Sequence, residues 1–295
     1  GAVYMDLFEE TYADYWIGIA VHNGDPMTDV VYDAGMGALI GGYPSAVVDR
    51  GADVDPSGMN ADFLDRLQTE PAGVILNGAT WDPNTRILEV SVNTTFSQNA
   101  SNSYKVACAL TEDDVTGTSS GYNQSNAYAG GGNGVMGGYE ALPNPVPAAQ
   151  MKYDHVARAI SPSFDGSSAS LPGTINAGES HISNYSFTLP AEWDEDNIHI
   201  IGLLIEPSGR IDNAGSTSIS EAVANGYEIG PNLGLAESFD YNVDDKLKVY
   251  PNPTSDVLNV SIVSPDAELN VISIYNHAGE LIREFDLNVT NGAWN

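Results

Sequence analysis

Residues 104–110 read YKVACAL, and this stretch decides the fold class because its side chains alternate with the period of a β-strand. Val106, Cys108 and Leu110 fall on one face, so that face is predicted to be buried. Further apolar runs that suit strands occur at residues 74–76, 87–92, 156–160, 182–189 and 198–205. Turn-rich segments separate these runs, and an antiparallel β-sandwich is therefore predicted over residues 71–240.

The first seventy residues have a different pattern, in which helical spacing alternates with short apolar runs. IGIAV at residues 17–21 and SAVVD at residues 45–49 predict strands. Asp25, which precedes a proline, predicts a helix start, and Asn60 predicts the cap of a later helix. Alternation of helix and strand predicts an α/β unit over residues 1–70, so the chain as a whole is of the α+β multidomain class.

A long polar excursion at residues 119–150 interrupts the predicted sandwich. It contains the glycine run GGGNGVMGG at residues 130–138, which lacks a lysine and predicts a flexible loop rather than a phosphate-binding loop. Tyr122, Tyr128 and Tyr139 lie in or beside this run. Tyrosine together with serine, glycine and asparagine is typical of recognition loops, so a binding loop is one hypothesis and a disordered surface loop is the other.

The charge of the chain excludes some partners. Forty acidic and ten basic residues give a net charge of −30, and the acidic residues are spread along the whole sequence. Such a surface repels nucleic acid and anionic lipid, and no apolar run is long enough to span a bilayer. The acidic loop pattern of an EF-hand calcium site is absent, and Asp113 with Asp114 is interpreted as a solvated pair.

No catalytic pattern is present in these residues. Cys108 is the only cysteine, so it has no partner for an intrachain disulfide and is interpreted as a buried core thiol. The histidines are not spaced as a helical zinc pair, and a Gly-x-Ser-x-Gly nucleophile motif does not occur. We therefore predict no metal and no cofactor, and leave open whether the protein is an enzyme. A third alternative, a secreted hydrolase, would need a polar cleft that contains a carboxylate or histidine with a shifted pKa. No motif in the sequence supports this alternative.

The C-terminal residues 247–262 read LKVYPNPTSDVLNVSI, and residues 272–282 read ISIYNHAGELI. The prolines forbid a helix, the following residues alternate as in a strand, and Ala278-Gly279 predicts a hairpin turn. The stretch around Tyr250, Pro251, Asn252 and Pro253 resembles the start of the type IX secretion sorting domain of Bacteroidetes. This resemblance implies export to the cell surface or medium, with the secretion machinery as a partner.

The same resemblance sets expectations for both ends of the chain. A polar linker at residues 238–246 leads into the sorting domain, which is assigned to residues 241–295. The family's sorting domain continues through further strands, so a truncated, partial β-sandwich is expected here. The sequence shows no signal peptide at Gly1, and we expect the exported protein to continue upstream of it.

Four motifs in the remaining sequence resemble the outer-membrane-protein-28-like family of Bacteroidetes. They are AVHNGDPM at 20–27, GYPSAVVDR at 42–50, YDHVARA at 153–159 and IDNA at 211–214. The resemblance implies a partial thioredoxin-like segment over residues 1–70, followed by an immunoglobulin-like sandwich.

In that family comparison, Tyr43 and Pro44 occupy the place of the cis-proline loop that faces the redox pair of a thioredoxin. The pair itself, Cys-x-x-Cys, is absent from the chain. Two functions are therefore predicted. The first is a secreted or cell-surface protein with a non-enzymatic binding or adhesion role toward an unknown extracellular ligand. The second is an extracellular thiol-disulfide oxidoreductase with its cysteines upstream of Gly1.

Overall fold

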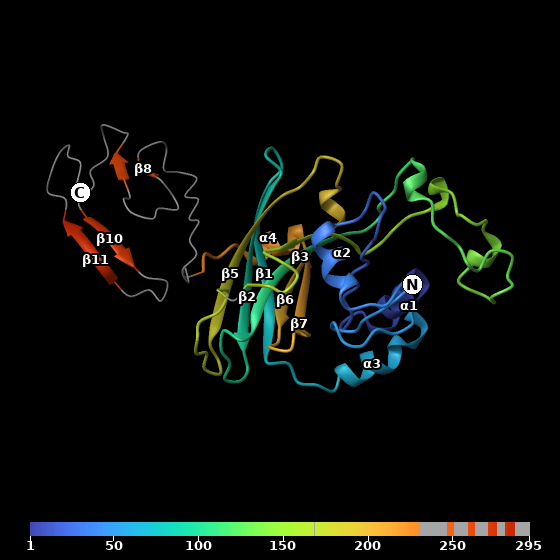
Figure 1. The fold of residues 1–295 in the computed structure, drawn as a ribbon, viewed down its shortest axis with the longest axis horizontal. Coiled ribbons are helices and arrows are strands. Elements are labelled where there is room, and N and C mark those ends of the chain that lie inside the picture. The colour runs from blue at the N-terminus through green and yellow to red at the C-terminus, as the bar shows by residue number, and fades with distance from the viewer. Residues whose placement is uncertain (168, 231–246, 251–258, 263–270, 276–280, 287–295) are drawn as a thin grey trace. The chain divides into compact units, whose positions relative to one another are not determined.

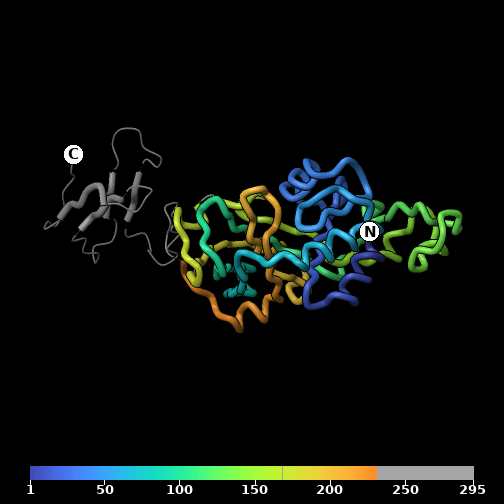
Figure 2. The backbone as a smooth tube through the Cα atoms, turned by 90° about the horizontal axis from the view of Figure 1, so that it is seen from below, coloured from blue at the N-terminus to red at the C-terminus, as the bar shows by residue number. Residues whose placement is uncertain are grey.

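The computed structural model describes residues 1–167 and 169–230, together with the strands at residues 247–250, 259–262, 271–275 and 281–286. The chain divides into two compact units, Gly1–Pro231 and Asn232–Asn295, and each is described by itself. In the first unit, helices lie at one side of a β-sandwich, and a long loop drawn in green extends past them (Figure 1). The tube in Figure 2 shows the same loop projecting from the helical end of the unit.

Two antiparallel sheets form the sandwich. The first has the order β1-β2-β5, from β1 (Gly73–Asp82), β2 (Ile87–Phe96) and β5 (Ser180–Thr188). The second has the order β4-β3-β6-β7, from β4 (Val156–Ser161), β3 (Lys105–Glu112), β6 (Ile198–Ile205) and β7 (Ile211–Ser218). The prediction of β-runs is confirmed at six of these strands, and the mixed α and β character of the chain is confirmed with them.

The space between the sheets is an apolar core. Its buried side chains include Leu88, Val90 and Val92 of β2, and Val106, Cys108 and Leu110 of β3. The face predicted from the alternation in residues 104–110 is therefore buried. The other face of β3 is buried as well, because Ala107 and Ala109 belong to a second apolar cluster on the outside of the same sheet.

The N-terminal segment covers that outer face. Ile17, Ile19 and Val21 pack against the second cluster, so the apolar alternation of residues 17–21 does serve burial. The predicted strands at 17–21 and 45–49 are nonetheless not formed. Each segment makes one isolated bridge, Ala20 with Val156 and Ala46 with Val54. The apolar pattern reflects burial without membership of a sheet, since residues 17–21 pack on the outer face of the sheet, whereas Ala46 and Val48 pack with the residues of α1 and α3.

Three helices lie in this segment, namely α1 (Ala2–Tyr12), α2 (Val30–Gly37) and α3 (Met59–Arg66). α1 and α3 share an aromatic core in which the rings of Phe8 and Phe63 are 5.2 Å apart between centroids, and Phe8 also lies 5.0 Å from the Trp16 ring that follows α1. α2 packs on the sheet instead. Edge-on and tilted contacts of this kind are favoured between aromatic rings. Residues 1–70 therefore have a small core of their own beside the sandwich.

The two predicted helix caps were wrong, and both errors have a local cause. Asp25 accepts a bond from the N–H of Met27 at 2.8 Å and thereby closes a turn. Asp29 caps α2 instead, where its carboxylate accepts from the N–H of Tyr32 at 2.7 Å. The helix that Asn60 was expected to cap begins one residue earlier, after a 3-10 turn that Asp55 caps.

Strand β7 and helix α4 (Ile219–Asn225) were not predicted, because IDNAGSTS carries little apolar alternation. Ser218 caps α4 in a capping box with Glu221. The close approach of the chain after α4 requires Gly78, since a Cβ there would lie 1.8 Å from the carbonyl oxygen of Gly226.

The segment after α4 is bound to the first sheet by side chains of that sheet. Asn184 Nδ2 donates to the carbonyl of Glu228 at 2.8 Å, and the N–H of Gly230 donates to Asn184 Oδ1 at 2.8 Å. Ser91 Oγ accepts from the N–H of Glu228 at 3.2 Å. Residues 226–230 are thus clamped to strands β2 and β5 before the chain leaves the first unit.

The second unit contains two antiparallel strand pairs. β8 (Leu247–Tyr250) pairs with β9 (Asn259–Ile262), and β10 (Val271–Tyr275) pairs with β11 (Leu281–Asp286). β9, β10 and β11 lie in the apolar runs that predict strands in the tail. The predicted turn at Ala278-Gly279 lies outside the described residues.

Candidate functional site

The 119–150 loop leaves and returns at one place beside the sandwich. The backbones of Val115 and Tyr153 bridge to each other there, at 2.9 and 3.0 Å. Around this bridge lies a small apolar cluster, against which Tyr122, Tyr139 and Leu142 of the loop pack. Its buried members are Met27, Val115, Val146, Met151, Tyr153 and Val156. The loop also contains short 3-10 turns at Ser120–Tyr122, Tyr139–Ala141 and Ala148–Gln150.

Asn126 anchors the loop from the inside. Its side chain is buried, and Nδ2 donates to the carbonyl oxygens of Tyr139 at 2.7 Å and Pro143 at 3.2 Å. Its Oδ1 accepts from the N–H of Tyr128 at 3.1 Å, and its own N–H donates to Asn144 Oδ1 at 3.0 Å. The side chain of Asn126 therefore joins both arms of the loop. A buried amide is stable only when its polar atoms are paired, and these bonds provide that pairing.

The glycine run is held by Glu140. Its Oε2 accepts from the N–H groups of Met136 at 2.8 Å and Gly138 at 3.1 Å, and these bonds hold the pKa of the carboxyl below its usual range. Gly134 and Gly138 have φ values of 97° and 95°, which only glycine adopts without strain. The run that was predicted to be a flexible loop thus has a conformation in which a residue outside it accepts two of its backbone hydrogen bonds.

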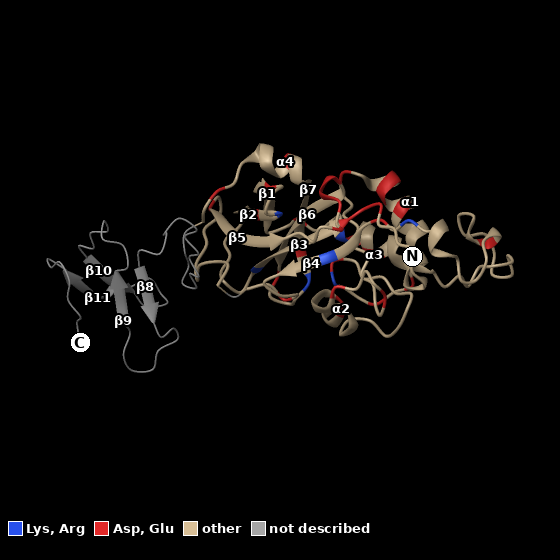
Figure 3. Cartoon of the chain, turned by 90° about the horizontal axis from the view of Figure 1, so that it is seen from above, with Lys and Arg blue, Asp and Glu red and all other residues tan. Residues whose placement is uncertain are grey.

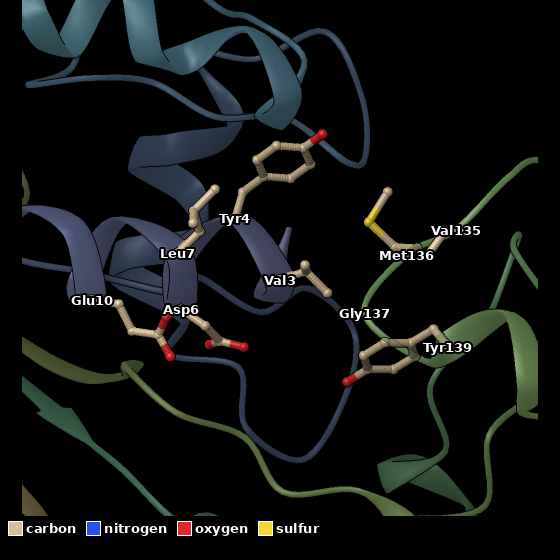
Figure 4. Close-up of a pocket in the computed structure, with 9 residues that line it drawn as sticks. All are labelled: Val3, Tyr4, Asp6, Leu7, Glu10, Val135, Met136, Gly137 and Tyr139. Atoms are coloured by element: carbon tan, nitrogen blue, oxygen red, sulfur yellow. The ribbon is translucent and has the colours of Figure 1, made fainter.

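A groove of about 460 Å³ lies between this run and α1. One wall is a face of α1, formed by Val3, Tyr4, Asp6, Leu7 and Glu10, and the other wall is formed by Val135, Met136, Gly137 and Tyr139. In Figure 4, the Asp6 carboxylate and the Tyr139 hydroxyl point toward each other across it. Gly137 packs so closely on α1 that a Cβ there would lie 2.9 Å from Val3 Cγ2.

The groove is electrostatically negative. Burial, followed by the charge of Asp154, raises the pKa of Asp6, while His155 acts in the opposite direction. Burial also raises the pKa of Tyr139, and the charges of Asp6 and Asp154 add to that shift. Figure 3 shows the acidic residues gathered over α1 and the neighbouring segments, whereas the strands of the sandwich carry few. A cation in the groove would be favoured, because it would offset the like charges of Asp6, Glu10 and the nearby Asp154.

A network of histidines and carboxylates joins α1 to the sandwich below the groove. His199 Nε2 lies 3.0 Å from Asp113 Oδ2, and Asp113 Oδ1 accepts from the N–H of His155 at 2.6 Å. His155 Nε2 lies 3.4 Å from Glu9 Oε2 on α1. The two histidines here connect neighbouring segments of the fold. Among the described residues, no group of three or more histidine, cysteine or acidic side chains could hold a metal ion.

The hydrogen bond with Asp113 raises the pKa of His199, although partial burial opposes it. Burial alone would raise the pKa of Asp113, but its bonds from His199 and His155 outweigh burial and lower it. Each partner therefore stabilises the charged form of the other.

The tyrosines predicted to form the binding loop are separated by the fold. Tyr139 lines the groove, whereas the Tyr122 ring packs over Gly117, where a Cβ would lie 2.2 Å from the ring. The Tyr122 carbonyl accepts from the hydroxyl of Tyr153 at 2.8 Å, so Tyr122 holds the base of the loop. Tyr128 is half-buried and is not among the residues that line the groove.

The other singled-out residues lie away from the groove. The Tyr43–Pro44 peptide bond is cis, and the Tyr43 hydroxyl donates to Asp33 Oδ1 at 3.3 Å. Cys108 is fully buried in the sandwich, and burial raises the pKa of its thiol, which makes it a core residue and not a nucleophile. Tyr250 ends strand β8, whereas Pro251, Asn252 and Pro253 lie outside the described residues.

Comparison with known proteins follows the same division of the chain. A family model described as outer membrane protein Omp28 matches residues 37–223, which is more than half of the 295 residues. The chain belongs to the Omp28 family. A second model, a secretion system C-terminal sorting domain, matches residues 248–294. Both resemblances inferred from the sequence are thereby confirmed.

Among curated proteins, none matches the chain. Among solved structures, the chain is similar to a domain of the outer membrane lipoprotein Omp28 from Porphyromonas gingivalis. The identity is 11% and the TM-score is 0.26, with 51% of this chain and 90% of that chain covered.

Family and tail together establish where the protein is found. An Omp28 family chain with a type IX secretion sorting tail is a secreted or outer-membrane-surface protein, and the tail implies interaction with the secretion machinery. The predicted location is confirmed. No helix among the residues that the structure describes is long and apolar enough to cross a membrane.

The Omp28-like motifs contact one another across the boundary between the N-terminal segment and the sandwich. The N–H of Ala20 donates to the carbonyl of His155 at 2.7 Å, which joins the first motif to the third. The N–H of Ile211 donates to the carbonyl of Asp49 at 3.0 Å, which joins the second motif to the fourth. Arg50 adds a cation–π contact, with its guanidinium carbon 3.6 Å from the centroid of the Phe164 ring. These motifs therefore hold the first unit together.

Most of the residues that line the groove carry no signal in the sequence that marks them as a site. Tyr139 was singled out by composition, but Asp6, Glu10 and Met136 were not. A signal did exist on α1, where Val3, Asp6, Leu7 and Glu10 recur at the spacing of one helical face. Nothing in the sequence says that this face meets residues 135–139, because that contact depends on the fold of the 119–150 loop.

Proposed function

We propose that this surface or secreted protein acts by non-enzymatic binding, through the groove between α1 and the 119–150 loop. The observation that carries the proposal is the conformation of the loop, which Asn126 and Glu140 fix by hydrogen bonds to its backbone. A loop that is ordered before binding loses little entropy when it binds. It presents a tyrosine, a methionine and a valine beside the carboxylates of α1, a mixture suited to recognition.

The proposal includes the domain organisation. The strand order β1-β2-β5 against β4-β3-β6-β7 supports an immunoglobulin-like sandwich over residues 71–240. The assignment of residues 1–70 as a thioredoxin-like segment rests on the family resemblance, and residues 241–295 would form the sorting domain that the secretion machinery recognises.

The test compares the full chain with Glu140→Ala, which releases the N–H groups of Met136 and Gly138 without touching the sandwich. Binding is measured on an array of glycans and immobilised extracellular proteins, and the dissociation constant is then determined for each probe that the wild type binds. Glu192→Ala is the matched control, because Glu192 is an exposed glutamate at a different place in the first unit.

We expect Glu140→Ala to raise the dissociation constant about tenfold, since two charge-assisted hydrogen bonds that order the loop are lost. Glu192→Ala should bind like the wild type. A wild-type chain that binds no probe on the array, or a Glu140→Ala chain that binds as well as the control, would contradict the proposal.

A further inference from the structure

We propose that the groove binds a segment of a partner protein in which a lysine or arginine side chain stands next to an apolar side chain. This inference rests on the proposed binding function and adds the chemistry of the ligand. Three features of the groove carry it, namely the spacing of its carboxylates, the state of the nearby lysine and the shape of its apolar walls.

The carboxylates are placed for a single cation. Asp6 and Glu10 are four residues apart on α1, so one turn of the helix sets both side chains on the same face. No basic side chain is among the described residues that line the groove. One ammonium or guanidinium group could thus contact both carboxylates, with the Tyr139 hydroxyl opposite them as a further acceptor.

The basic residue near this region is already paired. Lys152 forms an ion pair with Asp114, and its Nζ lies 3.8 Å from Asp154 Oδ1. Asp154 still acts on the groove, since its charge helps to raise the pKa values of both Asp6 and Tyr139. A cation from a ligand would relieve this concentration of negative charge, which no side chain of the groove does.

The walls of the groove favour a ligand in which an apolar side chain lies next to the cation. Leu7 of α1 is 50% exposed and Val135 of the loop is 82% exposed, which leaves both free to be covered by a ligand. Met136 stands on the same wall as Val135, and methionine adapts to differently shaped apolar groups. An open groove with apolar walls beside a pair of carboxylates suits an extended peptide better than a small polar molecule.

The experiment measures fluorescence anisotropy of labelled peptides with the full chain. One peptide carries a lysine flanked by leucines, a second carries glutamate in place of the lysine, and a third carries serines in place of the leucines. The variant Asp6→Asn/Glu10→Gln removes the charges at nearly constant shape, and Glu70→Gln, an exposed acid that does not line the groove, is the matched control. Circular dichroism checks that each variant is folded.

We expect the lysine–leucine peptide to bind, with a dissociation constant about tenfold higher for Asp6→Asn/Glu10→Gln and within about twofold of wild type for Glu70→Gln. The glutamate and serine peptides should each bind about tenfold more weakly or not at all. Equal binding of all peptides, or no effect of the double variant, would overturn the proposal. Spermidine that displaces the peptide at equal concentration would overturn the apolar part, because it would reveal charge attraction alone.

The outcomes also separate this inference from the function on which it rests. If Glu140→Ala weakens binding on the array while Asp6→Asn/Glu10→Gln does not, the binding function stands and the cationic ligand is wrong. If neither variant affects any binding, the groove is not the binding site.

Discussion

The sandwich and the 119–150 loop are stabilised in opposite ways. In the sandwich, fully buried side chains such as Leu110, Ile200 and Leu204 stabilise the fold by leaving water, and they need no specific partner atom. In the loop, Asn126 and Glu140 bind particular backbone groups, and few large apolar side chains are buried. The comparison teaches that the sandwich sets the stability of the first unit, whereas the loop sets the shape of its surface.

Substitutions in the two regions should therefore destabilise parts of the structure that differ in size. Removal of core volume in the sandwich affects both sheets and lowers the stability of the entire unit. Removal of a hydrogen bond in the loop frees a segment that projects from the helical end, and local opening can occur without global unfolding.

Leu110→Ala should lower the free energy of unfolding by about 2–5 kcal/mol, because it leaves a cavity between the sheets. Urea unfolding followed by tryptophan fluorescence measures the change. Leu76→Ala is the matched control, since Leu76 is 56% exposed on β1 and its loss should cost less than about 1 kcal/mol. Equal effects of the two substitutions would contradict the separation of core from surface.

Asn126→Ala should destabilise the loop by about 1–3 kcal/mol, because the carbonyl oxygens of Leu142 and Pro143 lose the donor that Asn126 Nδ2 supplies. Hydrogen exchange should accelerate at backbone amides within residues 119–150, while amides of β3 and β6 keep their protection. Asn133→Ala removes a single bond at an exposed position, to the carbonyl of Ala127, and should have the smaller effect. Faster exchange throughout the strands would mean that the loop is not an independent region.

The smallest effect is expected outside this contrast, at His199 in the network that joins α1 to the sandwich. A folded-state pKa raised above the ordinary value of 6.5 stabilises the protein below that pH, and the contribution disappears as the pH rises through the folded-state pKa. Because 39% of the His199 side chain is exposed, solvent screening limits the contribution to about a few tenths of a kcal/mol.

Urea unfolding of the wild type and His199→Gln at about pH 5.5 and about pH 8.5 isolates this contribution as a difference between the two proteins. The wild type should have its greater advantage at the lower pH. An advantage that grows with pH instead would show that Asp113 does not hold the protonated imidazole.

Much of the fold could be predicted, because a strand with one buried face has apolar residues at every second position of the sequence. YKVACAL at residues 104–110 alternates, and its strand lies where expected. The same rule over-predicted strands at residues 17–21 and 45–49, since burial on the outer face of the sheet or against α1 and α3 produces the same apolar pattern without strand pairing. It missed β7 because a strand of small polar residues has no apolar period to detect.

The site was less predictable, because its two walls come from residues more than a hundred positions apart. Composition could indicate the loop and Tyr139, but not the bonds from Glu140 and Asn126 that give the loop its shape. Composition also could not distinguish Asp25 from Asp29 as the N-cap of a helix, since aspartate is preferred at that position in either case. The turn that Asp25 forms with Met27 leaves Asp29 as the cap.

The clamp on residues 226–230 has a mechanical consequence. The sorting tail follows Gly230 in the chain, so any pull on the tail reaches the first unit through the paired bonds of Asn184 before it reaches a strand of the core. The two hydrogen bonds of Asn184 are therefore expected to bear an applied force first. Tension during export would first detach residues 226–230 from the first sheet. The force on the strands of the sandwich would stay low until the bonds of Asn184 have opened.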